Sequence, residues 1–110
     1  MIRLTAHFWV QAYLARLRLD GIPAFVVAKG EPTAGAVLVK LNMLNGSARC
    51  YQRSFDPSRG RRIWMTLAEG KEDDVDASLH RQREIDPDLW IIEVEDRRGR
   101  HFLHEPGFED

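Results

Sequence analysis

The chain has 110 residues, 44% hydrophobic and 30% charged, which is enough apolar material for one stable core and too little for two. Its 16 Lys and Arg nearly balance its 17 Asp and Glu, and a formal net charge of −1 excludes a global field that would attract nucleic acid or an acidic membrane. The single Cys50 offers no intramolecular disulfide and no pair of thiolates for a metal, so we expect a reducing compartment and a cytoplasmic protein.

The first predicted element is a helix over residues 5–19. Thr5 is a suitable N-cap, and Asp20-Gly21 followed by Pro23 is a helix stop. Apolar residues cover most of this helix, which indicates burial on more than one side, either within the domain or under a partner subunit. Its longest uncharged stretch, residues 4–15, is well short of the roughly 20 residues that a membrane-spanning helix needs, so we expect no membrane partner.

Short β-branched and aromatic runs follow, typical of an antiparallel meander in which consecutive strands pair. The predicted strands are 24–28, 36–44, 48–55 and 61–68, with Asn45-Gly46 as a hairpin turn. A second helix is predicted over 72–85, then strands over 89–96 and 101–104, and a flexible C-terminal tail over 105–110.

These elements predict a single α+β domain over residues 1–110 with the order α-β-β-β-β-α-β-β. We expect two layers, a mainly antiparallel sheet of five or six strands with both helices packed on one face.

No recognisable catalytic, cofactor-binding or metal-binding motif is present, which favours a non-enzymatic protein without settling the question. In the Gly-containing loop 29–36 the lysine precedes the turn and a strand follows, the wrong order for a phosphate loop. His101 and His104 are three residues apart on a predicted strand, which would turn them to opposite faces and keep them from one metal ion. Alternation places Cys50 on the face opposite Arg49 and Tyr51, which indicates a small core residue.

The strongest local signal is charge patterning. Residues 49–62 contain five arginines and one aspartate, whereas residues 69–76 contain five carboxylates and one lysine. Alternation brings arginines and aromatic rings of two neighbouring strands onto one face, and such a face suits single-stranded nucleic acid if it is exposed and a core if it is buried. This candidate interaction surface consists of Arg49, Tyr51, Arg53, Phe55, Arg62 and Trp64.

Four blocks carry a family resemblance: LTAHFWVQAYLARLRLDGIPAFVV, PTAGAVLVKLN, YQRSFDP and DPDLWIIEVEDRRGRHFLHEPGF. Together they resemble a small bacterial family, found chiefly in alphaproteobacteria and catalogued as domain of unknown function 1491. The resemblance implies one cytoplasmic domain and transfers no activity, cofactor or catalytic residue. Taken with the aromatic residues that interfaces favour, the blocks suggest four secondary site candidates: Trp9, Arg16, Arg18 and Asp56.

Three functions remain open at this point. The apolar girdle of the first helix and the three tryptophans favour a module that binds a protein partner or itself, with a homodimer as one form. The Arg and aromatic face supports single-stranded nucleic-acid binding as the alternative. An enzyme that acts on a small molecule is the second alternative.

Overall fold

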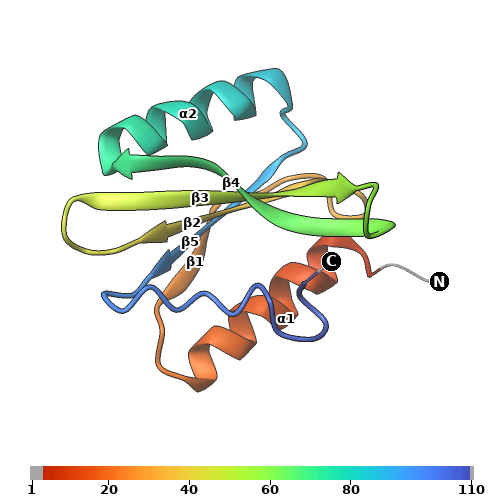
Figure 1. Ribbon diagram of the computed structural model, residues 1–110, viewed down its shortest axis with the longest axis horizontal. Helices are drawn as coiled ribbons and strands as arrows, with labels where there is room; N and C mark the ends of the chain where they lie inside the picture. The colour runs from red at the N-terminus through yellow and green to blue at the C-terminus, as the bar shows by residue number, and fades with distance from the viewer. Residues whose placement is uncertain (1–3, 110) are drawn as a thin grey trace.

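The structure, a computed structural model, describes residues 4–109, and residues 1–3 of the predicted domain and Asp110 of the predicted tail lie outside this range. Figure 1 shows a sheet with one helix on each side. In chain order the elements are α1 (Ala6–Leu19), β1 (Ala24–Ala28), β2 (Val37–Asn42), β3 (Ser47–Asp56), β4 (Arg61–Lys71), α2 (Glu72–Ile85) and β5 (Trp90–Glu95).

The sheet has five strands in the order β1-β5-β2-β3-β4. Strand β5 inserts between β1 and β2, parallel to β2 and antiparallel to β1, and the β2–β3 and β3–β4 pairs are antiparallel. The α+β class and the mainly antiparallel sheet are therefore confirmed. The prediction that consecutive strands pair is wrong at one step, because β1 pairs with the last strand, β5, and not with β2.

The two helices lie on opposite faces of the sheet, which corrects the prediction of one shared face (Figure 1). Helix α1 packs with Val37, Val39 and Ile92 on one face. Helix α2 buries Val75 and Leu79 against a smaller cluster on the other face. The central strands β2 and β5 begin with three apolar residues in succession, which is typical of strands covered on both faces. The architecture is thus three layers, helix on sheet on helix.

The predicted strand over 101–104 is absent, because residues 101–104 form a loop and the start of a turn after β5. Phe102 has a φ of 57°, a left-handed conformation that a strand does not contain. This segment crosses the face that α1 covers, with Leu103 buried and Phe102 and Phe108 packed at the edge of the same core. The chain after β5 thus completes the α1 layer.

Local signals at the ends of elements behave as predicted. Thr5 caps α1, with its Oγ1 accepting a hydrogen bond from the Phe8 N–H at 3.2 Å. Asn45 and Gly46 do lie between β2 and β3, and Gly46 adopts a φ of 88° that favours glycine. The predicted strand over 36–44 is too long, however, because β2 ends at Asn42 and the connection spans residues 43–46, with Leu44 at a φ of 60°. Neither helix within residues 4–109 has the length and apolarity to span a membrane.

Candidate functional site

The predicted Arg and aromatic surface lies on the α1 side of β3 and β4. Tyr51 belongs to the α1-side core and Cys50 to the α2-side core, so the two sides alternate as predicted. Trp64 on β4 pairs with Arg53, and Arg62 pairs with Phe55, which brings the four side chains together. Exposure increases along the strand, from buried Tyr51 through half-buried Trp64 to Phe55, which is 63% exposed. The surface is thus buried in its middle, at Tyr51, and exposed at both ends, at Arg49 and Phe55.

Trp9 of α1 lies at the centre of an aromatic cluster beside this surface. Its indole stacks on Tyr13 at 4.9 Å between ring centroids and lies 5.6 Å from Trp64. The guanidinium of Arg53 lies over both indoles, 4.9 Å from each ring centre, so cation–π contacts hold it in place. The Trp9 Nε1–H is buried and has no hydrogen-bond partner among the described residues.

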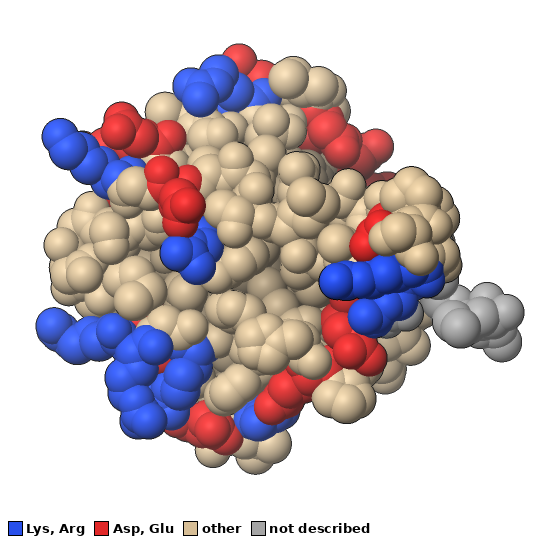
Figure 2. Space-filling model, viewed as in Figure 1, with Lys and Arg blue, Asp and Glu red and all other residues tan. Residues whose placement is uncertain are grey.

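A groove of about 540 Å³ opens where the start of α1 faces the turn between β3 and β4; we call it the hairpin groove. Its described lining contains no carboxylate. Figure 2 shows Lys and Arg side chains at the right of the molecule, where Figure 1 places this turn, with Asp and Glu side chains above and below them. The groove is lined by Leu4, Thr5, Ala6, Trp9, Thr33, Ala34, Gly35, Arg53, Phe55, Gly60, Arg61, Arg62 and Gly107.

A smaller hollow of about 270 Å³ lies beyond Trp64 and is lined in part by Tyr51, His101 and His104. The two imidazoles lie 4.9 Å apart, which corrects the prediction that they point to opposite faces. The correction follows from the turn conformation of residues 101–104. The Leu103 N–H donates to His101 Nδ1 at 3.0 Å, and burial, together with His104 and Arg49, lowers the pKa of His101 to about 4. His101 is thus neutral at pH 7, with its proton on Nε2.

No set of three or more His, Cys, Asp and Glu side chains within residues 4–109 is arranged to hold a metal ion. Burial raises the pKa of the Cys50 thiol to about 12, so Cys50 stays protonated and is a poor nucleophile.

The remaining predicted site residues do not join the groove. Arg49 pairs with Glu69 across the β3–β4 hairpin at 2.9 Å. Arg16 holds Glu105 at 2.8 Å and lies over the Phe102 ring, so it fixes the C-terminal segment to α1. Arg18 is exposed in the last turn of α1. Asp56 accepts hydrogen bonds from Ser58 in the β3–β4 turn, and these lower its pKa.

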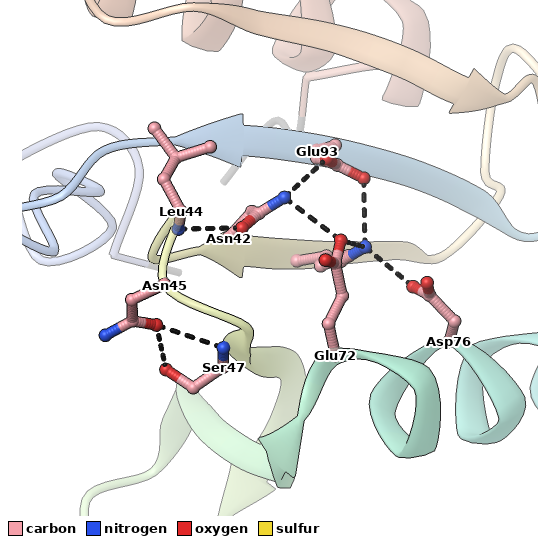
Figure 3. A network of polar contacts seen from close by, with 8 residues as sticks. Asn42, Leu44, Asn45, Ser47, Glu72, Asp76 and Glu93 are labelled. Atoms are coloured by element: carbon pink, nitrogen blue, oxygen red, sulfur yellow. Dashed lines mark hydrogen bonds and ion pairs between the residues drawn. The ribbon is translucent and has the colours of Figure 1, made fainter.

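The sequence reasoning missed a polar cluster between the sheet and α2 (Figure 3). Lys40, on β2, is 3% exposed, and its ammonium lies 2.8 Å from Glu72, 2.7 Å from Asp76 and 3.2 Å from Glu93. Burial by itself lowers the pKa of Lys40, but the hydrogen bonds to these carboxylates raise it above its ordinary value. Lys40 stays charged and its three donors are occupied, so the cluster is a structural tie and not a source of a free amine. The signal in the sequence was a lone charge inside an apolar strand.

Comparison with known proteins finds relatives along most of the chain. The family model DUF1491, described as a protein of unknown function, matches residues 4–104. A crystal structure and an NMR structure of a DUF1491 family protein from Caulobacter crescentus CB15 are each 42% identical to the chain, with a TM-score of 0.82, covering 96% of this chain and 97% of that one. A solution structure of a protein from A. tumefaciens is 29% identical, with a TM-score of 0.72 and 86% of each chain covered. No curated protein sequence matches the chain.

Proposed function

The chain belongs to the DUF1491 family, whose description assigns no function, and from its own surface we propose that it is a self-associating module that pairs through the open edge of β1. The supporting observation is a strand edge that is both apolar and uncovered. A second copy of the chain is the partner that we propose.

Strand β1 is an outer strand of the sheet, and within residues 4–109 it pairs only with β5. Three consecutive apolar side chains, Phe25, Val26 and Val27, are between 37% and 53% exposed, and no residue of the strand is charged. An outer strand presents unpaired N–H and C=O groups, and apolar side chains beside them favour pairing with another strand.

The opposite outer strand is protected in the way that β1 is not. Strand β4 carries charged side chains at both ends, with Arg61 and Arg62 at its start and Glu69 and Lys71 at its end. Charges on an outer strand oppose edge-to-edge pairing because their burial is costly. The contrast favours β1 as the associating edge.

Two copies of β1 can pair antiparallel about a two-fold axis, which joins two five-stranded sheets into one and makes the interface close on itself. The register of β1 against β5 shifts between Val26 and Ala28, so the regular part of the open edge is short. A short edge buries a small area, and we expect a reversible dimer with a dissociation constant on the order of micromolar.

Sedimentation velocity over a range of protein concentrations tests this proposal. We expect the wild-type chain to shift from monomer to dimer as concentration rises. The double variant Phe25→Lys/Val27→Lys places two charges on the exposed edge and should remain monomeric at every concentration. Circular dichroism should show that the variant is folded.

The control is Leu19→Lys, which adds one lysine charge at an exposed apolar position of α1, away from the edge. This variant should dimerise like the wild type. A wild-type chain that stays monomeric at high concentration, or a dimer that the edge charges leave intact, would contradict the proposal.

We also infer that the protein works in the cytoplasm. The support is the lone, fully buried Cys50, since a protein built for an oxidising compartment usually uses its cysteines in pairs.

A further inference from the structure

We propose that the hairpin groove binds a nucleotide, with the phosphate against the arginines and the base against the ring of Phe55. Nothing in the self-association proposal requires this site, because β1 does not line it. A volume of about 540 Å³ falls within the range of small-molecule sites, roughly 300–1,000 Å³. The size therefore suits one nucleotide.

The positive charge of the groove lining favours an anionic ligand. Arg53, Arg61 and Arg62 all line the groove, and the described lining contains no carboxylate. Arg61 approaches Glu109 only at 4.0 Å, and Arg53 and Arg62 also interact elsewhere in the chain. The proposal therefore rests on the net positive charge of the walls and does not require any of these arginines to be without a partner. Arginine suits phosphate because its planar fork can donate two parallel hydrogen bonds.

Helix α1 adds to this positive field without supplying direct contacts. The first turn of α1 has no acidic residue, whereas that of α2 has three. The positive end of the α1 dipole therefore faces the groove without a countercharge from its own first turn. Its first N–H groups are already occupied, since Ala6 donates to Thr33 O and His7 to Pro32 O. The phosphate contacts must come from the arginine side chains.

The aromatic part of the lining specifies a planar ring. Phe55 is 63% exposed on the groove wall, so its ring is accessible to a ligand in the groove. Bases stack on such rings regardless of their identity. Trp9 also lines the groove, and its buried Nε1–H has no hydrogen-bond partner among residues 4–109. The exposed walls thus offer a planar ring and cations.

Titration calorimetry at 50 mM salt with three probes tests the proposal: AMP, inorganic phosphate and a ten-residue oligouridine. We expect AMP to bind and phosphate alone to bind at least tenfold more weakly, because only AMP can stack on Phe55. An oligouridine that binds more tightly than AMP, with an affinity that falls steeply with salt, identifies a single strand as the source of the nucleotide. An oligouridine that binds no more tightly than AMP identifies a free nucleotide.

Two variants locate the site, each with a matched control. Phe55→Leu and Arg62→Gln should each weaken AMP binding about tenfold. Phe25→Leu makes the same change at another exposed ring, and Arg81→Gln removes a charge from exposed α2, so both should leave AMP binding unchanged. Absence of AMP binding at millimolar concentration would overturn the proposal. Equal binding of AMP and phosphate, or Phe55→Leu without effect, would overturn it as well.

Discussion

His101 is the residue whose environment departs most from what its neighbours in the sequence suggest. Its Nδ1 accepts the Leu103 N–H, its backbone oxygen accepts the Tyr13 hydroxyl at 2.7 Å, and its ring lies 4.7 Å from Tyr51. Protonation of the ring would place a donor against the Leu103 N–H and a charge beside Arg49. The fold therefore requires the neutral imidazole.

This requirement makes stability fall as the solution becomes acidic. The pKa of His101 is about 4 in the folded chain and about 6.5 in the unfolded one, so the unfolded chain binds the extra proton between these values. Because the side chain is half-buried, solvent screening reduces the effect, and we expect the free energy of unfolding to fall by about 1 kcal/mol from pH 7 to pH 5. Urea denaturation at the two pH values measures this.

The variant His101→Asn keeps an acceptor for the Leu103 N–H and does not titrate, so it should lose most of this pH dependence. Replacing the exposed histidine of α2, His80→Asn, should leave it intact. Equal pH dependence in the wild type and in His101→Asn would show that other groups cause the acid destabilisation.

At the scale of single residues, the sequence predicted what depends on neighbours in the chain. Thr5 as a cap and Cys50 as a core residue are confirmed, because capping and alternation are local rules. The pairing of His101 with His104 was predicted wrongly. The two rings meet because Phe102 between them has a left-handed backbone conformation. No local propensity favours that conformation for phenylalanine, and the packing of Phe102 against the core accompanies it.

At the scale of elements, helix α2 is tied to the sheet as much by charge as by apolar contact. Only Val75 and Leu79 of its side chains are fully buried, whereas Glu72 and Asp76 both reach Lys40. Lys40→Met would leave Glu93, whose side chain is 13% exposed, and the two helix carboxylates without their cation. We expect the variant to lose about 3 kcal/mol of unfolding free energy in urea denaturation.

The control Lys29→Met removes an exposed lysine and should change stability little. The double variant Lys40→Met/Glu93→Gln should recover part of the loss, because it removes one of the uncompensated charges. If Lys40→Met is as stable as the wild type, the ion pairs of the cluster contribute no net free energy of unfolding.

The helices were predicted within one residue of their observed ends, because caps and stops are written locally. Their placement on opposite faces was not predicted, although a signal was present. Val37, Leu38 and Val39 are apolar in succession, and so are Trp90, Ile91 and Ile92, which is typical of strands buried on both faces. The insertion of β5 next to β2 is a long-range choice that no local pattern specified.

At the scale of the whole molecule, the near-neutral charge of the chain conceals separated regions. Arg49 of the basic segment forms an ion pair with Glu69 of the acidic one, and Glu72 at the acidic start of α2 forms an ion pair with Lys40. Arg59 pairs with Asp56 in the β3–β4 turn, whereas Arg53, Arg61 and Arg62 line the hairpin groove. The sequence predicted a basic and an acidic segment. The groove that the basic segment lines could not be predicted, because Trp9 and Gly35, which also line it, come from distant parts of the chain.

The C-terminal segment is the last part of the molecule whose role can be tested by a simple change. The sequence predicts a flexible tail over 105–110, and the contacts of its described part favour a docked segment. The Phe108 ring lies 5.9 Å from Trp9 and 5.6 Å from Tyr13, and its backbone oxygen accepts the Trp64 Nε1–H at 2.6 Å. Deleting residues 105–110 should therefore lower the unfolding free energy by about 2–4 kcal/mol.

Urea denaturation monitored by tryptophan fluorescence measures the loss of unfolding free energy and reports the exposure of Trp64. The variant Phe108→Ala should cause much of the same loss in the full-length chain, because the ring supplies most of the apolar contact. Glu109→Ala, next to it, should cost little, since Glu109 reaches Arg61 only at the surface. If the deletion leaves stability and fluorescence unchanged, the segment is flexible as its sequence suggests, and the aromatic cluster of Trp9 and Trp64 is stable without it.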